Sequence, residues 1–90
     1  MSGMMTLTFE DACELVRNRS KDLVLTESDK RMMYTYYKVA TVGSQPNVPR
    51  PSNISPKVSY WDAWNTHGPK ITPHTAKLLY VGMVMKRASE

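Results

Sequence analysis

The residues best suited to chemistry in this 90-residue chain lie between Arg31 and Gly43, where three of the five tyrosines fall within four positions. At the helical angle of about 100° per residue, one face of this stretch gathers aromatic rings and cations: Lys30, Tyr34, Tyr37, Lys38 and Thr41. The other face gathers core-forming residues: Met32, Met33, Tyr36, Val39 and Ala40. Rings beside cations suit a planar, anionic ligand. The alternative is that Tyr34 and Tyr37 are half-buried rim residues and Lys38 is a solvated charge.

Other residue types that support catalysis or metal binding are sparse. Cys13 is the only cysteine, so no internal disulfide is possible, and its apolar neighbours indicate a small core side chain. The sequence shows no orienting partner that would make Cys13 a nucleophile. His67 and His74 flank a predicted turn, but no second cysteine or spaced acid supports a metal pair there. We therefore predict no catalytic residue, no metal ligand and no cofactor, and the protein is not expected to be an enzyme.

The net charge of +4 is a mild excess that suggests an anionic partner without naming one. A small basic helical module that binds nucleic acid or an acidic protein is one alternative, and it predicts cations aligned along one helix. The cations are instead scattered over all the predicted helices, so nucleic-acid binding is not expected. No apolar run approaches the roughly 18 residues of a membrane-spanning helix. Residues 1–8 lack the pattern of a signal peptide, and the expected location is the cytoplasm.

Four helices, over residues 9–19, 27–42, 56–67 and 73–87, are predicted to position these side chains within one domain spanning residues 1–90. Each start carries a capping pattern: Thr8 with Asp11, Thr26 with Asp29, Ser55-Pro56 and Thr72-Pro73. Gly43 is expected to end the second helix. Leu23, Val24 and Leu25 are expected to pack against the bundle. Nothing favours strands, so the fold class is all-α.

The last predicted helix carries two apolar stripes. Its core stripe is Ala76, Leu79, Tyr80, Met83 and Val84. Leu78, Val81 and Met85 form the second stripe, which is expected to be partly exposed. Exposure would favour a weak, transient contact with a membrane or with another copy of the chain. The alternative is that Met4, Met5 and Leu7 cover it.

Two sequence blocks, separated by a proline-rich loop containing Arg50-Pro51, carry a family resemblance when they are taken together. They are Tyr34-x-x-Tyr37-Lys38-x-Ala40-Thr41-Val42-Gly43 and Trp61-Asp62-Ala63-Trp64-Asn65. From about Phe9 to the end of the last helix, the chain resembles the acyl-CoA-binding proteins. The resemblance implies an up-down-down-up four-helix bundle that binds long-chain fatty acyl-CoA esters without catalysis. It also implies an intracellular carrier and pool former in fatty acid metabolism, expected here as a monomer.

The resemblance also implies site residues. Those expected at the CoA head group are Arg17, Tyr34, Tyr37, Lys38 and Tyr80, and those expected along the acyl chain are Phe9, Cys13 and Val16. Lys30 and Arg31 occupy acyl-groove positions that are commonly apolar in the family. Tyr60 stands where similar proteins have a phosphate-binding lysine. Lys57, three residues earlier on the same helix face, is expected to supply the missing cation, with Tyr60 as a secondary donor. The alternative is that Lys57 is solvated and that Arg17 or Arg31 meets the phosphate.

Overall fold

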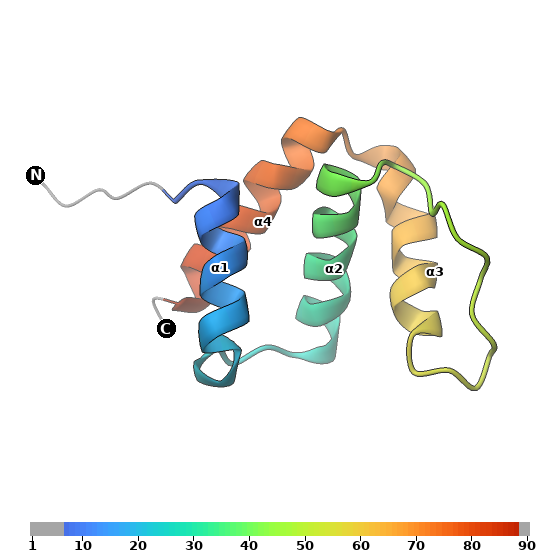
Figure 1. The fold of residues 1–90 in the computed structure, drawn as a ribbon, viewed down its shortest axis with the longest axis horizontal. Helices are drawn as coiled ribbons and strands as arrows, with labels where there is room; N and C mark the ends of the chain where they lie inside the picture. The colour runs from blue at the N-terminus through green and yellow to red at the C-terminus, as the bar shows by residue number, and fades with distance from the viewer. Residues whose placement is uncertain (1–6, 89–90) are drawn as a thin grey trace, which may run out of the picture.

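Four α-helices make up most of the described part of the chain, residues 7–88 of a computed structural model. They are α1 (Phe9–Arg19), α2 (Glu27–Thr41), α3 (Val58–His67) and α4 (Pro73–Ala88), and short 3-10 helices, η1 (Ser20–Asp22) and η2 (Gly68–Lys70), follow α1 and α3. Helices α2 and α3 run in one direction and α1 and α4 in the other (Figure 1). The expected all-α, up-down-down-up bundle is confirmed. None of the described helices is long and apolar enough to cross a membrane.

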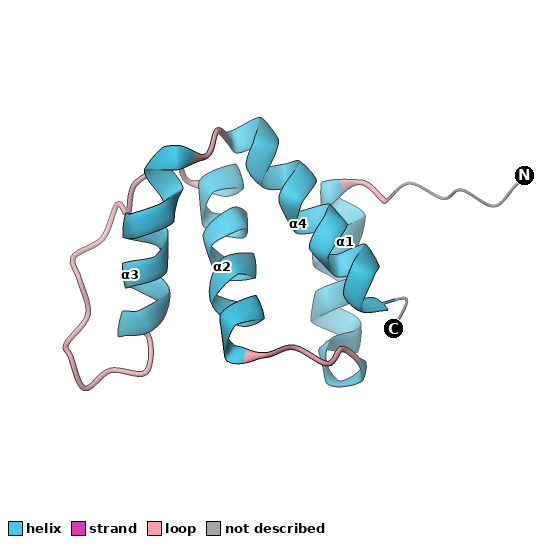
Figure 2. Ribbon diagram, turned by 180° about the vertical axis from the view of Figure 1, so that it is seen from behind, coloured by secondary structure: helices cyan, strands magenta, loops and turns pink. Residues whose placement is uncertain are grey.

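Helix α4 crosses behind α1 (Figure 1) and packs on both α1 and α2. Both helices pack on α4, α3 packs on α2, and direct contact between α1 and α2 is sparse. Seen from behind, α4 lies in front of α1 (Figure 2). The core accordingly has two clusters: Ala12, Met33, Tyr80 and Val84 between α1, α2 and α4, and Val39, Trp64 and Ala76 between α2, α3 and α4. This arrangement leaves space between α1 and α2.

Local side-chain to backbone bonds start three of the helices as predicted. The pairs are Thr8 with Asp11 for α1, Thr26 with Asp29 for α2, and Thr72 with Thr75 for α4. At α2 the Thr26 hydroxyl accepts from the Asp29 amide at 3.0 Å, and the Asp29 carboxylate accepts from the Thr26 amide at 3.1 Å. Such caps satisfy amides that the first helical turn leaves without partners.

The end of α2 and the start of α3 differ from the expected positions, and α4 ends at Ala88, one residue later than expected. Helix α3 begins at Val58, two residues late, because the Ser55 hydroxyl accepts from the Lys57 amide at 3.1 Å and makes a turn instead of a cap. Helix α2 ends at Thr41, one residue early. Gly43 follows it at φ 147°, a conformation that favours glycine, so its expected role as terminator is confirmed.

Several burial predictions depend on packing that the sequence does not show. Thr35, which was not predicted as core, is fully buried, and its hydroxyl donates to the Arg31 carbonyl at 3.0 Å. Leu79 was predicted as core but is 41% exposed, and Val24 is 78% exposed. The second stripe of α4 is partly exposed as expected, with Leu78 at 61%. Of its alternative cover, Met4 and Met5 lie outside the described residues, whereas Leu7 lines a hollow together with Leu78 and Val81.

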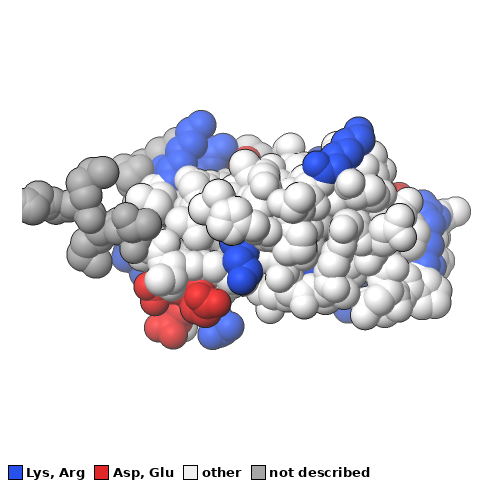
Figure 3. Space-filling model, turned by 90° about the horizontal axis from the view of Figure 1, so that it is seen from above, with Lys and Arg blue, Asp and Glu red and all other residues white. Residues whose placement is uncertain are grey.

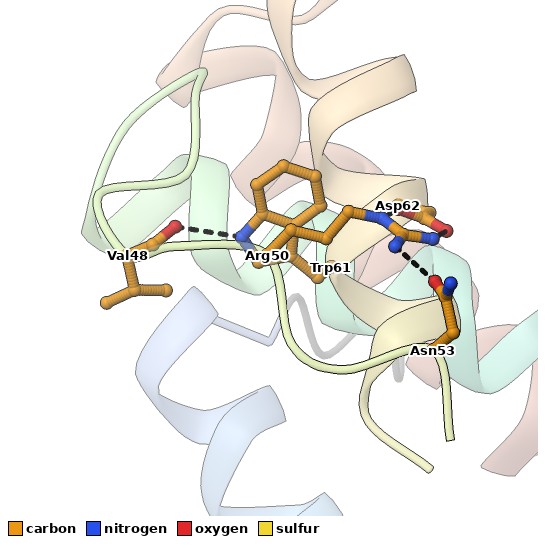
Figure 4. A network of polar contacts seen from close by, with 5 residues as sticks. All are labelled: Val48, Arg50, Asn53, Trp61 and Asp62. Carbon is orange, nitrogen blue, oxygen red and sulfur yellow. Dashed lines mark hydrogen bonds and ion pairs between the residues drawn. The ribbon is translucent and has the colours of Figure 1, made fainter. Parts of the chain in front are cut away.

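The loop of residues 43–57 is fixed against α3 by polar contacts (Figure 4). The Arg50 guanidinium makes two bonds to the Asp62 carboxylate, at 2.8 and 3.0 Å, and also contacts Asn53. The Trp61 indole donates to the Val48 carbonyl at 2.9 Å. The first tryptophan and the aspartate of the W-D-A-W block therefore hold the loop in place through side-chain hydrogen bonds.

Candidate functional site

A cluster of rings and one ammonium group lies between α2 and α3. The Tyr34 ring meets the Tyr60 ring edge-on, with the centroids 5.4 Å apart, and the Trp64 ring at 6.3 Å. The Lys38 ammonium lies 5.6 Å from the Tyr34 centroid and 5.7 Å from the Trp64 centroid, within cation–π range. We call Tyr34, Lys38, Tyr60 and Trp64 the α2–α3 cluster. It offers flat surfaces and a positive charge at one place.

Trp64 anchors this cluster to the end of α2. Its side chain is buried, and its indole N–H donates to the Gly43 carbonyl at 2.9 Å. Burial also raises the pKa of Tyr34 above the usual value for a phenol. Tyr34 is therefore neutral near pH 7 and its hydroxyl remains a hydrogen-bond donor.

An apolar groove of about 240 Å³ runs between α1 and α2, and we call it the α1–α2 groove. Its lining residues are Val16, Leu25, Lys30, Met33, Tyr34, Tyr37 and Tyr80. Lys30 is the one charged residue among them. Its ammonium pairs with Glu27 at 3.3 Å, which leaves the methylene stem to line the groove. Tyr34 belongs to both features, so the groove and the α2–α3 cluster adjoin at this residue.

A second hollow, of about 400 Å³, lies beside the groove, and Tyr37 lines both. Its other lining residues come from α1 and the end of α2: Phe9, Glu10, Cys13, Glu14, Arg17 and Thr41. The Phe9 ring lies 6.1 Å from Tyr37 and 5.3 Å from Tyr80 between centroids. This hollow combines an aromatic wall with both the Arg17 guanidinium and two carboxylates.

Tyr80 and Cys13 are neutral groups at the meeting point of α1 and α4. Burial raises the pKa of Tyr80 far above its usual value, and the neighbouring Cys13 adds to the rise. Burial likewise raises the pKa of Cys13, against the opposing effect of a hydrogen bond to Tyr80. A raised thiol pKa lowers the thiolate fraction near neutral pH. These shifts fit the interpretation of Cys13 as a packing residue.

The structure divides the expected site residues between these three places. Tyr34, Lys38 and Tyr60 form the α2–α3 cluster. Val16, Lys30, Tyr37 and Tyr80 line the α1–α2 groove, and Phe9, Cys13 and Arg17 line the adjacent hollow with Tyr37. Arg31 and Lys57 belong to neither lining set, and Lys57 is exposed at the N-cap of α3. Three residues of the ring-and-cation face expected on α2, Lys30, Tyr34 and Tyr37, line the α1–α2 groove together. Tyr34 and Lys38 also contact α3, whereas Tyr37 contacts α1 and α4.

Sequence reasoning missed two residues of the groove. Met33 was predicted only as core, but it both packs in the core and lines the groove. Leu25 was expected only to pack against the bundle; it packs against the core as expected, and it also lines the groove. The sequence signal that could have identified Leu25 was the connector before α2, which is too hydrophobic to be entirely an exposed loop. Within residues 7–88 no group of three or more His, Cys, Asp or Glu side chains lies close enough to hold a metal ion.

Comparisons with known proteins agree with this geometry. The family model described as Acyl CoA binding protein matches residues 6–84. Among solved structures, Oryza sativa Acyl-CoA-Binding Protein 2 is 27% identical with a TM-score of 0.69, over 90% of this chain and 91% of that one. The acyl CoA binding protein from Babesia bovis is 33% identical with a TM-score of 0.74, over 90% of each chain. No curated protein matches the chain. Since the family match spans most of its length, the chain belongs to the acyl-CoA-binding protein family.

Proposed function

We propose that this protein binds long-chain fatty acyl-CoA esters and serves as a monomeric, non-catalytic carrier and pool former for them in the cytoplasm. The observation that carries the proposal is that Tyr34 belongs both to the apolar α1–α2 groove and to the α2–α3 cluster, so the two surfaces adjoin there. An acyl-CoA has the same division into an apolar chain and an anionic, aromatic head. Both the proposed site and its ligand therefore pass from an apolar part to a polar, aromatic part at one point.

The head group of CoA carries an adenine ring, a pyrophosphate and a 3′-phosphate. An adenine ring packs well on tyrosine, which presents an aromatic face and a polar tip. Phosphate oxygens require fixed cations and donors, and Lys38 beside Tyr34 supplies one of each. Arg17 and the donors of the adjacent hollow extend the polar surface beyond Tyr37. We assign the head group to these residues, together with Tyr60 and Lys57.

The acyl chain fits the α1–α2 groove because methylene groups gain free energy wherever they leave water for an apolar lining. Val16 and Met33 contribute opposite walls of the groove, and Tyr80 contributes from α4. The Lys30 stem extends the apolar surface while its ammonium remains paired with Glu27. We therefore assign Lys30 to the path of the chain.

Binding to nucleic acid is the alternative function suggested by the positive charge. It would require a row of cations that follows a phosphate backbone. Seen from above, basic side chains stand apart on a largely uncharged surface, with acidic side chains gathered near one end (Figure 3). On this face the separated cations form no row that could follow a phosphate backbone.

Titration calorimetry with palmitoyl-CoA tests the proposal. Lys38→Ala should weaken binding by about tenfold to 150-fold, the loss expected for one charge-assisted hydrogen bond of about 1.5 to 3 kcal/mol. Lys86→Ala is the matched control, because Lys86 lines a different hollow on the far side of α4. This variant should bind palmitoyl-CoA as tightly as the wild type does. Equal affinities in both variants, or tighter binding to duplex DNA than to palmitoyl-CoA, would contradict the proposal.

A further inference from the structure

Among the described residues that line the α1–α2 groove, Lys30 alone carries a charge. Its ammonium lies 3.3 Å from the Glu27 carboxylate, and the two side chains are 46% and 69% exposed. Glu27 lies one helical turn before Lys30 and does not line the groove. The Glu27–Lys30 pair is therefore a hydrated, charged border on an otherwise apolar surface.

This border lies at one end of the groove. The residues of α2 that line the groove share one face at helical spacing: Lys30, Met33, Tyr34 and Tyr37. Lys30 comes first among them, and Leu25, which lines the same end, precedes α2 in the chain. Lys38, the cation of the α2–α3 cluster, directly follows Tyr37 at the opposite end. A ligand whose anionic head lies near Lys38 therefore has the Glu27–Lys30 pair ahead of its acyl chain.

The distance between the two ends limits the length of chain that the groove can bury. Tyr37 follows Lys30 by seven residues, which is a rise of about 10 Å along α2. An extended chain advances about 1.2 Å per bond, because the three backbone bonds of one amino acid residue span at most about 3.6 Å. An acyl chain that enters the groove beside Tyr37 thus reaches the Glu27–Lys30 pair after about eight to ten carbons.

Carbons beyond the pair gain little affinity from burial. A methylene group that moves from water onto an apolar lining raises affinity about fourfold. A methylene group that covers the Lys30 ammonium or the Glu27 carboxylate must instead displace water from a charge, and this cost opposes the gain. The free energy of binding should therefore improve with each carbon up to the pair and change little after it.

We propose that the Glu27–Lys30 pair sets the acyl-chain length at which affinity stops rising. The protein then selects acyl-CoA esters with chains of about ten carbons or more and does not distinguish among the longer ones. The inference rests on the proposed function, because it concerns the acyl end of the same ligand. Lys30 is its specificity-determining residue: the methylene stem lines the groove, and the ammonium ends it.

Calorimetric titration of the wild type and of Lys30→Met with octanoyl-, dodecanoyl- and palmitoyl-CoA tests the inference. Methionine keeps a long, flexible side chain and removes the charge. In the wild type, dodecanoyl- and palmitoyl-CoA should bind within about twofold of each other, less than the gain from one buried methylene. Lys30→Met should bind palmitoyl-CoA about tenfold more tightly than the wild type does, as expected for about two more buried methylenes. Its affinity for octanoyl-CoA should change less than about twofold, because that chain ends before the pair.

Two further variants separate the charge from its position. Lys30→Arg keeps the charge and should keep the wild-type dependence on chain length. Lys70→Met makes the matched replacement at an exposed residue outside the groove, and it should bind each ester as the wild type does. Exposed ion pairs contribute little to stability, so each variant should fold, which circular dichroism checks.

Three results would overturn the inference and leave the proposed function intact. They are a wild-type affinity that rises about fourfold per methylene through palmitoyl-CoA, a chain-length dependence in Lys30→Met identical to that of the wild type, and an equal gain in Lys70→Met. Equal binding of CoA and palmitoyl-CoA by the wild type is a different result. It would contradict the proposed function and this inference together.

Discussion

Single side chains in this protein belong to two surfaces at once, and this sharing connects the parts of the site. Tyr34 lines the α1–α2 groove and also packs in the α2–α3 cluster. Tyr37 lines the groove and also the adjacent hollow. Each residue therefore stands at a boundary between apolar and polar surroundings, which suits tyrosine because its ring is apolar and its hydroxyl is a donor. Replacing either ring would change both neighbouring surfaces.

The cation that meets the 3′-phosphate is a prediction at this scale. Lys57 is exposed at the N-cap of α3, one turn before Tyr60, and a helix N-terminus favours an anion. The wild type should bind palmitoyl-CoA more tightly than its 3′-dephospho analogue. Lys57→Ala should lose most of that preference, and Lys57→Arg, which keeps the charge, should retain it. The measurement is calorimetric titration with both ligands.

The competing assignment gives a different pattern with the same two ligands. If Lys57→Ala keeps the full preference while Arg17→Ala or Arg31→Ala removes it, an arginine meets the phosphate and Lys57 is a solvated surface charge.

At the scale of elements, the sequence predicted the features that depend only on residues close together in the chain. The capping pairs at Thr8 and Thr26 act within one turn, so their local pattern was sufficient. Ser55 failed as a cap because a bond two residues ahead made a turn instead. Leu79 and Val24 were wrong as packing residues because their burial depends on where the other helices lie. Periodicity identifies a helix face but not its neighbours.

The candidate site was predictable in part for the same reason. Tyr34 and Lys38 stand out by residue type and spacing, and the family resemblance added Tyr60 and Tyr80. The sequence could not predict that Tyr37 and Tyr34 contact different helices. This difference arises because α2 packs on both α3 and α4. Leu25 was missed as a lining residue because the connector has no period from which to assign a face.

The contact between Arg50 and Asp62 should control the loop before α3. The pair is bidentate but half-exposed, so Arg50→Ala should shift the midpoint of thermal unfolding only slightly. The loop should nevertheless loosen, and the Trp61 indole hydrogen, which donates to Val48, should exchange with solvent faster. Proton NMR of the indole signals measures this exchange, and the buried Trp64 indole provides an internal control that should remain slow.

Unchanged exchange at Trp61 in Arg50→Ala would mean that the tryptophan holds the loop without help. Faster exchange at both indoles would mean that the substitution disturbs the bundle as well as the loop.

At the scale of the whole molecule, one partly buried ion pair joins distant parts of the chain. Arg87, near the end of α4, binds Asp29, in the first turn of α2, across 58 positions. The Thr26 amide and the Arg87 guanidinium both hold the pKa of Asp29 below its usual value near 3.8. Because the folded-state pKa is depressed, the stabilisation is complete above pH 3.8 and is lost as pH falls through the folded-state value.

Asp29→Asn should therefore unfold at a lower temperature than the wild type at pH 7, and the difference should shrink below about pH 3.8. Asparagine keeps a capping oxygen but loses the charge that faces Arg87. Asp22→Asn is the control, because the Asp22 pair with Arg19 is exposed and contributes little. Thermal unfolding followed by circular dichroism at several pH values measures both variants. A difference that is independent of pH would show that the charge of Asp29 is not what stabilises the bundle.

The molecule as a whole places the α1–α2 groove, our proposed site for the acyl chain, on one side of α4, whereas the exposed Leu78 lies on another side of this helix. The central claim concerns the groove, and titration calorimetry with CoA and acyl-CoA esters of increasing chain length tests it most directly. Each methylene buried contributes about 0.8 kcal/mol, or roughly a fourfold gain in affinity. We expect affinity to rise steeply with chain length and then level off once the groove is filled, and free fatty acid to bind far more weakly than its CoA ester. Equal affinity for CoA and for long-chain acyl-CoA would contradict the account.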